Sequence, residues 1–362
     1  MKEMKVKLED VCERGTSNLK QSDIVEIDGD YPIYGASGYI GNVDFYHQEN
    51  PYVAVVKDGA GIGRTTLHPA KSSVIGTMQY LIPKENVIPE YLYYVVSYMH
   101  LEKYFTGATI PHIYYKDYKN EKFNLDPLDR QKTIVDTLGK CEAVIKARKR
   151  ELELMDILIK ARFVEMFGDP VSNSNGLPES TLPELGEFGR GISKHRPRND
   201  PKLLGGDYPL IQTGDVANAG LYITSYSSTY SELGLKQSKM WDNGTLCITI
   251  AANIAKTSIL KFDACFPDSI VGFNANEKTN NIFIHYWFSF FQAILESQAP
   301  ESAQKNINLK TLSELKVIVP VKDKQDKFVE FIKQVDKSKV AVQKALDETQ
   351  MLFDSLMQKY FG

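Results

Sequence analysis

The sequence LDRQKTIVDTLGKCEAVIKARKRELELMDILIKARFVEMFG, residues 128–168, occurs a second time in diverged form as KDKQDKFVEFIKQVDKSKVAVQKALDETQMLFDSLMQKYFG, residues 322–362. A shift of 194 residues aligns the two copies without a gap and places Gln131 on Gln325. Internal repeats have to be found first, because each copy predicts the same structural unit. The chain is therefore organised as two related halves.

Both copies carry a heptad pattern. Steps of four and three residues select ten positions in each copy, of which eight are apolar, and Lys, Arg, Glu and Asp dominate the positions between them. Neither copy contains Pro, and a pattern sustained over about five heptads is typical of a coiled coil. We predict two helices that pack on each other, since antiparallel pairing would put one globular unit at each end; two unrelated amphipathic helices are the alternative. The heptad positions are Ile134, Leu138, Cys141, Ile145, Arg148, Leu152, Met155, Ile159, Arg162 and Met166, and Phe328, Ile332, Val335, Lys339, Val342, Leu346, Thr349, Phe353, Leu356 and Tyr360.

Composition limits the class of protein. A chain of 362 residues with 43% hydrophobic residues is long enough for two or three folded domains. The four cysteines show no CxxC pair or metal spacing, and no apolar signal core or membrane-spanning run is present. We expect a soluble cytoplasmic protein without a metal or cofactor. Because the net charge is −3, any contact with nucleic acid must depend on local basic patches or on a partner.

The two segments outside the helices are diverged copies of each other. Residues 206–209 repeat the GDYP of residues 29–32, and residues 268–272 (DSIVG) resemble residues 72–76 (SSVIG). Both segments mix strand-like runs and glycine turns with one aromatic-rich helix that we expect to be core. The predicted domains are residues 1–127, 128–168, 169–321 and 322–362.

These motifs together resemble a known family, the specificity subunit of type I restriction-modification systems. The resemblance covers essentially the whole chain. Its most specific part is the helix pair, with LDRQ and KDKQ at the starts and ARFVEMFGDP and QKYFG at the ends. The runs YPIYGASGYIG and GAGIGR resemble the opening parts of that family's target-recognition domains. One departure is that the first such domain begins almost at Met1, without a long leading helix.

The resemblance implies both a fold and a function. The fold would be α+β, with two mixed α/β target-recognition units joined by two long antiparallel coiled-coil helices in a pseudo-twofold repeat. Each unit would recognise one half of a bipartite site in double-stranded DNA, and the helices would set the spacing and dock two methyltransferase (modification) subunits. Catalysis would belong to those partners and to a separate restriction subunit.

Three local motifs suggest an enzyme, but their context does not support one. The sequence GAGIG, residues 59–63, differs from the glycine loop of a methyltransferase because Arg64 stands where the third glycine would fall and a β-like segment follows. Asn50-Pro51-Tyr52 lacks the second Pro of the NPPY-type motif. Pro267-Asp268 and Glu277-Lys278 lack the Glu-x-Lys spacing of a nuclease. We predict no catalytic residues.

The predicted DNA-binding residues are cations and small polar groups in loops. The most basic loop follows Gly186, and its Lys and Arg side chains suit phosphates and guanine edges; a solvated surface loop is the alternative. The glycine turn near Arg64, its counterpart near Lys256 and the loops before each long helix supply the others. The predicted set is Lys57, Arg64, Thr109, His112, Arg190, Lys194, Arg196, Arg198, Lys256, Lys305 and Asn306.

Two other classes of function remain open on sequence alone. One is a self-contained DNA methyltransferase or nuclease. The other is a coiled-coil scaffold that makes no contact with DNA. The recognised bases cannot be derived, because single side chains do not specify bases without a docked geometry.

Overall fold

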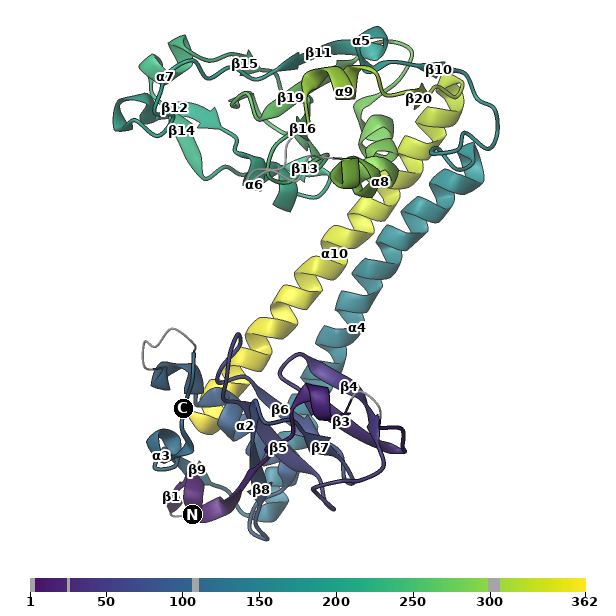
Figure 1. Ribbon diagram of the computed structural model, residues 1–362. Coiled ribbons are helices and arrows are strands. Elements are labelled where there is room, and N and C mark those ends of the chain that lie inside the picture. Colours follow the sequence, from purple (N-terminus) through teal and green to yellow (C-terminus); the bar gives the residue numbers. More distant parts are fainter. Residues whose placement is uncertain (1–3, 25–26, 106–110, 299–306) are drawn as a thin grey trace. The chain divides into compact units, whose positions relative to one another are not determined.

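The computed structural model consists of two compact units whose equivalent elements follow the same order, with additional elements in the second unit (Figure 1). The first unit comprises Met1–Arg150 and Val342–Gly362, and the second comprises Glu151–Ala341. The structure describes residues 4–24, 27–105, 111–298 and 307–362.

The first unit contains a larger sheet with strand order β2-β8-β5-β6 and a smaller sheet with order β4-β3-β7. Strand β5, with the sequence YVAVV, is buried at every position. Val53 and Val55 pack against helix α2, whereas Tyr52, Ala54 and Val56 pack toward the smaller sheet, as the alternation of a strand requires. The elements are β1 (Met4–Lys7), α1 (Leu8–Val11), β2 (Cys12–Thr16), β3 (Tyr31–Gly35), β4 (Gly38–Val43), β5 (Tyr52–Val56), β6 (Thr65–His68), β7 (Ser73–Val74), β8 (Met78–Pro83), α2 (Pro89–Tyr98), α3 (Tyr115–Tyr118) and β9 (Lys122–Leu125).

The second unit contains a larger sheet with order β11-β19-β16-β17-β13 and a smaller sheet with order β14-β12-β18-β15. Strand β16 is again buried on both faces: Leu246 and Ile248 pack toward helix α8, and Cys247 packs on the opposite side. The elements are β10 (Glu179–Ser180), α5 (Leu182–Leu185), β11 (Gly186–Arg190), β12 (Leu204–Leu210), α6 (Thr213–Asn218), β13 (Tyr222–Ile223), β14 (Ser228–Tyr230), α7 (Glu232–Lys236), β15 (Met240–Trp241), β16 (Leu246–Thr249), β17 (Thr257–Leu260), β18 (Ala264–Cys265), β19 (Ile270–Ala275), α8 (Asn281–Gln298), α9 (Leu309–Ser313) and β20 (Val317–Ile318).

The two units share one topology, which confirms that the segments are diverged copies. The order β2-β8-β5-β6 recurs as β11-β19-β16-β17, and β4-β3-β7 recurs as β14-β12-β18. The predicted match of residues 268–272 with residues 72–76 is wrong. Ser73 and Val74 form β7 of a smaller sheet, whereas Ile270 lies in β19 of a larger sheet. The likeness arose because short buried strands use similar apolar residues before a glycine.

The long helices α4 (Leu128–Phe167) and α10 (Lys322–Phe361) pair in antiparallel fashion. Each unit holds the first half of one helix and the second half of the other, and within the second unit the Phe163 and Phe328 rings lie 5.4 Å apart. All twenty predicted heptad positions are buried or half-buried. The buried face of α4 is wider than the heptad positions predict. Phe163 and Phe167 lie outside the heptad positions, and both rings pack on Phe283 of α8.

Each helix also begins with the same buried glutamine, and both side chains are fully buried. The Gln131 Nε2 group donates to the backbone C=O of Asn86 (2.9 Å) and Asp126 (2.8 Å), and its Oε1 accepts from the Ile88 N–H (3.0 Å). A buried amide is tolerated only when its hydrogen bonds are made. The glutamine therefore ties the start of the helix to the segment that precedes it.

Gln325 makes the equivalent set of bonds in the second unit. Its Nε2 group donates to the backbone C=O of Lys278 (3.0 Å) and Pro320 (2.8 Å), and its Oε1 accepts from the Thr279 hydroxyl (2.9 Å). The one difference is that the donor to Oε1 is a side chain here and a backbone N–H in the first unit. The repeat of Gln131 as Gln325 thus preserves a specific contact.

The aromatic-rich helices are core, as predicted. Tyr91 in α2 and Phe283 and Trp287 in α8 are fully buried. Helix α2 ends at Tyr98; His100 adopts a left-handed conformation with φ of 51°, and the chain continues as the 3-10 helix Leu101–Tyr104. All four cysteines are free and buried.

Candidate nucleic-acid interface

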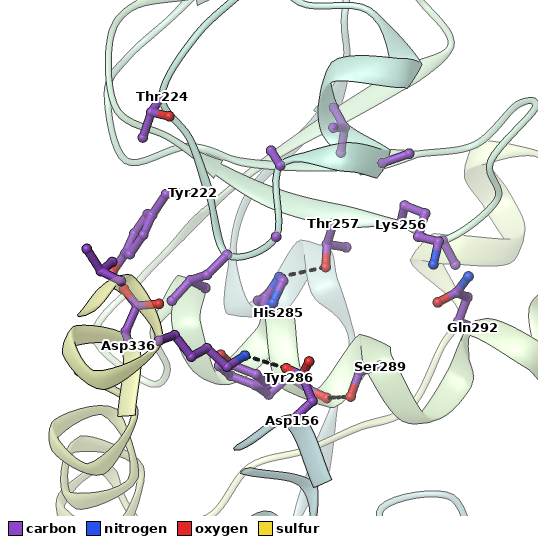
Figure 2. Close-up of a pocket in the computed structure, with 18 residues that line it drawn as sticks. Asp156, Tyr222, Thr224, Lys256, Thr257, His285, Tyr286, Ser289, Gln292 and Asp336 are labelled. Carbon is purple, nitrogen blue, oxygen red and sulfur yellow. Dashed lines mark hydrogen bonds and ion pairs between the residues drawn. The ribbon is translucent and has the colours of Figure 1, made fainter. Parts of the chain in front are cut away.

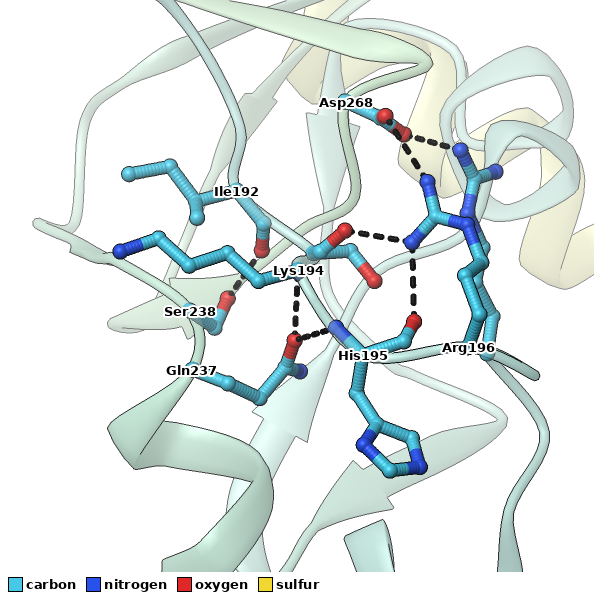
Figure 3. Close-up of polar contacts among 9 residues, drawn as sticks. Ile192, Lys194, His195, Arg196, Gln237, Ser238 and Asp268 are labelled. Carbon is cyan, nitrogen blue, oxygen red and sulfur yellow. Dashed lines mark hydrogen bonds and ion pairs between the residues drawn. The ribbon is translucent and has the colours of Figure 1, made fainter.

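The basic loop of the second unit, residues 191–203 between β11 and β12, has a defined backbone (Figure 3). The Gln237 Oε1 atom accepts hydrogen bonds from the backbone N–H groups of Lys194 (2.7 Å) and His195 (3.0 Å). Gln237 follows α7, so a separate element of the unit supports this loop. The loop thus differs from a surface segment held only at its ends.

The base of this loop is closed by close backbone contact. A Cβ on Gly191 would lie 2.3 Å from the Phe266 carbonyl oxygen, so only glycine fits there. The Ser238 hydroxyl donates to the Ile192 C=O at 2.8 Å. A loop fixed before binding loses less conformational entropy when a ligand binds.

Two arginines of the loop pair with one carboxylate. Arg196 Nη2 lies 3.4 Å from Asp268 Oδ2, and Arg198 Nη2 pairs with Asp268 Oδ1. Arg196 Nη1 also donates to the backbone C=O of Ser193 (2.6 Å) and His195 (2.8 Å). Figure 3 shows Asp268 facing the Arg196 guanidinium. Arg196 therefore stabilises the loop itself, whereas Arg198 keeps most of its N–H donors available.

The remaining cations of this region are unpaired within the described part of the chain. Arg190, Lys194 and Lys202 form no ion pair there. Asp200 is occupied by His195, whose Nε2 lies 3.1 Å from its Oδ2. The backbone N–H of Lys202 and the His195 ring hold the pKa of Asp200 below its usual value. The loop therefore presents exposed positive charge.

The equivalent loop of the first unit has the opposite charge. Residues 17–30, between β2 and β3, include one Lys and four acidic residues. Asp23 accepts from the backbone N–H of Lys20 at 2.9 Å, which is the main reason that its pKa is lowered. Such a loop repels phosphates, so any DNA contact of this unit needs other residues. The charged residues are Lys20, Asp23, Glu26, Asp28 and Asp30.

The glycine turn of the first unit brings Lys57 and His112 together. The backbone N–H of Ile113 donates to the Lys57 C=O at 3.0 Å. The His112 Nδ1 atom pairs with Asp58 Oδ1, so this histidine already has a carboxylate partner. These two predicted residues therefore lie side by side although they are far apart in the sequence.

Arg64 ends the same turn. Its Nη2 donates to the backbone C=O of Ala36 in the β3–β4 hairpin. Gly63, with φ of 81°, packs so closely that a Cβ would lie 2.4 Å from the Glu102 nitrogen. Strand β6 follows the turn, so no helix begins there as a methyltransferase glycine loop requires.

Lys256 occupies the same place in the second unit as Arg64 in the first. The Val56 N–H donates to the Arg64 C=O, and the Thr249 N–H donates to the Lys256 C=O, each at 2.9 Å. The sequence places Lys57, Arg64 and Lys256 near two similar turns, and the hydrogen bonds show that Arg64 is the residue equivalent to Lys256. Both units therefore carry a cation at the end of this turn.

Lys256 lines a cavity of about 480 Å³ in the second unit, bounded by α6, α8 and the long helices (Figure 2). Two of the four Asp and Lys side chains in its lining form an ion pair. Asp156 pairs with Lys339, and the His285 ring lies 2.9 Å from the Thr257 hydroxyl. Burial lowers the pKa of His285 to about 4, so this ring is neutral at pH 7.

Three predicted residues, Thr109, Lys305 and Asn306, lie outside the described residues. Two contributors were missed: Asp268 was interpreted as structural only, and Gln237 was not considered. Both residues contact the basic loop although they are at least 42 residues away from it in the sequence. No local sequence pattern indicates such contacts.

The long helices carry exposed apolar residues outside the heptad positions. Ile157 and Leu158 on α4 are 55% and 50% exposed, and Met351 and Leu352 on α10 are 64% and 53% exposed. The 194-residue shift aligns the two pairs. Exposed apolar residues that recur at equivalent places indicate a contact surface rather than chance. The alignment of the two copies places these apolar pairs on each other, but the heptad pattern does not include their positions.

Two findings limit the chemistry of the described residues. They contain no group of three or more His, Cys, Asp or Glu side chains arranged to hold a metal ion. None of their helices combines the length and apolar character needed to cross a membrane.

The fold and the site together define a class of tandem protein. Two units of one topology are built around paired long helices, and the two units differ in the loops that they present. The family model for the type I restriction modification DNA specificity domain matches residues 1–154 and 179–349. The chain belongs to this family.

Individual relatives agree with this assignment. The chain is 22% identical over 341 residues to a protein of Methanocaldococcus jannaschii assigned as a type I restriction enzyme MjaX specificity subunit, covering 88% of this chain and 75% of that protein. The fold of this chain is similar to that of the S subunit of a type I restriction-modification system from M. genitalium, with a TM-score of 0.62 and 15% identity. The match covers 99% of this chain and 96% of that chain. The fold is also similar to that of a chain in a solved structure on the complex assembly and conformational transition of the type I R-M system. The TM-score is 0.56 and the identity is 15%, and the match covers 99% of this chain and 97% of that chain.

Proposed function

We propose that this protein is the DNA specificity subunit of a type I restriction-modification complex and recognises a bipartite site in double-stranded DNA. Residues 1–127 and 169–321 act as target-recognition domains, one for each half-site. Residues 128–168 and 322–362 act as the helices that set the spacing between the half-sites. The complex works in the cytoplasm, on the DNA of the host.

The observation that carries this proposal is the contrast between two loops at the same place in one topology. The second unit has a basic, pre-organised loop where the first unit has an acidic one, so the two units must contact DNA through different residues and can recognise different sequences. A scaffold without DNA contact gives no reason for a supported cluster of exposed cations. Family membership supports the same conclusion.

The chain itself is non-catalytic in this proposal. Methyl transfer belongs to two methyltransferase subunits, and DNA cleavage belongs to restriction subunits where these are present. The glycine turn that precedes strand β6 supports this division, because it lacks the helix start that binds a methyl donor. No cofactor is assigned to this chain.

The two exposed apolar pairs support docking of two identical subunits. Ile157 with Leu158 and Met351 with Leu352 are equivalent under the repeat, so one type of partner surface fits both. Each pair lies off the heptad positions, so a partner can bind without disturbing the helix pairing. Because each of the four side chains is already about half buried, its complete burial contributes roughly half of the 1.5–3 kcal/mol that a fully exposed side chain would gain.

The function is tested by mapping adenine methylation. The chain is co-expressed with its modification subunit in a host that lacks adenine methyltransferases, and methylated adenines are located by single-molecule sequencing. We expect one bipartite motif with two unrelated halves. A complex that methylates no defined motif contradicts the proposal. Methylation by the purified chain with S-adenosylmethionine and no partner contradicts the non-catalytic assignment.

The docking surfaces are tested separately by native mass spectrometry of the assembled complex. Ile157→Asp with Leu158→Asp is expected to leave one modification subunit bound, and Met351→Asp with Leu352→Asp is expected to remove the other. Lys160→Asp, on the same helix, is the control and should keep two. Retention of two subunits by both double variants contradicts this assignment.

A further inference from the structure

The basic loop of the second unit contains one feature that phosphate binding does not explain. Asp268, which precedes β19, places a carboxylate against Arg196 and Arg198. A negative charge beside two cations weakens their attraction for a phosphate. A loop that served only to bind phosphates would be better without Asp268.

We infer that Arg198 and Asp268 form a guanine-recognition pair, in which Arg198 donates two N–H groups to O6 and N7 of a guanine and Asp268 positions the guanidinium. The inference rests on the proposed function, because it requires that the second unit contact DNA. Guanine is the base that presents two acceptors side by side in the major groove, and a planar guanidinium matches them.

The donor inventory selects Arg198 over Arg196. A guanidinium has five N–H donors. Arg196 uses Nη1 on two backbone carbonyls and Nη2 on Asp268. Within the described residues, Arg198 uses only Nη2, again on Asp268. Arg198 therefore keeps Nη1, Nε and the second hydrogen of Nη2, and that Nη2 hydrogen together with a neighbouring N–H forms the planar pair of donors that guanine needs.

The support around the pair favours a fixed orientation. The Arg198 side chain is 46% exposed and that of Asp268 is 33% exposed, so the pair lies at the surface and can be reached. Arg196 and Gln237 both hold the loop backbone at residues 193–195, shortly before Arg198. Base recognition requires such a fixed side chain, whereas a phosphate contact tolerates a flexible one.

In the first unit, the sequence of the loop at the same place, residues 17–30, contains no arginine, so it supplies no equivalent of Arg198. The inference therefore applies to one half-site only, which gives the experiment an internal reference.

The test compares methylation motifs of complexes that contain the wild-type chain, Arg198→Lys, Asp268→Asn or Lys202→Ala. Arg198→Lys keeps the charge but loses the planar pair of donors. It is expected to relax one guanine position of one half-site, with a loss of discrimination of about tenfold to hundredfold, and to leave the other half unchanged. Asp268→Asn is expected to relax the same position less. Lys202→Ala should lower methylation evenly without changing the motif.

The outcomes separate this inference from the proposed function. An unchanged motif in Arg198→Lys, or a wild-type motif without guanine in either half-site, overturns the guanine pair and leaves the specificity function standing. A wild-type complex without any motif overturns both. If Arg198→Lys abolishes methylation, the affinity of the variant complex is measured for duplexes in which single base pairs of the site are replaced. Loss of the preference for guanine supports the pair, and a retained preference overturns it.

Discussion

The loop after the first strand of the larger sheet differs in charge between the two units, although the strands around it pair in the same way. Residues 17–30 carry one Lys and four acidic residues, whereas residues 191–203 carry four Lys or Arg and one Asp. Strand order is determined by buried side chains, which both units retain. Loop charge is free to diverge because it contributes little to the core.

The long helices diverged much less than the loops. Gln131 and Gln325 make equivalent buried contacts, and the exposed apolar pairs occur at equivalent places. Under the proposed function, a change at either kind of site would disturb folding or the docking of a shared partner, whereas a loop change would alter only DNA binding. Binding specificity can therefore change while the framework is kept.

The largest expected effect comes from reversing the loop charges. Lys194→Glu with Arg198→Glu should weaken binding of the assembled complex to its site roughly 100-fold or more, because two phosphate- or base-contacting cations become acids. Asp28→Lys with Asp30→Lys, in the loop of the first unit, is the matched change and should alter affinity by about tenfold or less. Fluorescence anisotropy at fixed salt measures both. Equal effects would remove the distinction between the loops.

A smaller effect is expected from the buried glutamines. Gln131→Leu leaves the Ile88 N–H and two carbonyls without partners and should lower the free energy of unfolding by about 2–3 kcal/mol. Gln325→Leu should cost less, because the Thr279 hydroxyl can rotate to another acceptor. Urea denaturation measures both, with the exposed Gln343→Leu as a control within about 0.5 kcal/mol of the wild type. A larger cost for Gln325→Leu would contradict this account.

The smallest effect concerns pH and one histidine of the first unit. His68 is buried on the Tyr52 ring, and burial lowers its pKa to about 4. The unfolded chain, with a pKa near 6.5, binds a proton that the folded chain does not, so stability falls as the pH drops from about 6.5 toward 4. The expected loss between pH 7 and pH 5 is about 2 kcal/mol. Leu260 occupies the same place in the second unit and does not titrate.

Denaturation of His68→Gln at both pH values tests this difference. The variant should lose about 2 kcal/mol less than the wild type between pH 7 and pH 5, while the exposed His100→Gln should behave as the wild type does. An identical pH response of His68→Gln and the wild type would show that His68 titrates normally in the folded chain.

The long helices and the aromatic-rich helices could be predicted because their signals are local. The heptads predicted both long helices, since hydrophobic periodicity depends on residues a few positions apart. The topological equivalence of the units was predicted only in part. Short buried strands resemble one another, which is why residues 268–272 were matched to the wrong strand.

The predicted cations were located correctly as loop residues, but their relations were not. Arg198 and Asp268 are 70 residues apart in sequence, and Arg64 became the counterpart of Lys256 only through backbone hydrogen bonds. Such contacts depend on how β11 and β19 are placed beside each other, which no local pattern encodes. The DNA-binding role of these residues stays a prediction.

The central claim is that the paired helices hold two different recognition units at a set spacing. Inserting seven residues into both α4 and α10 keeps the heptad phase and adds about 10 Å, or about three base pairs of duplex. Mapping of methylated adenines with the lengthened complex measures the result. We expect both half-sites to be unchanged and the gap between them to grow by about three base pairs. An unchanged gap would contradict the claim.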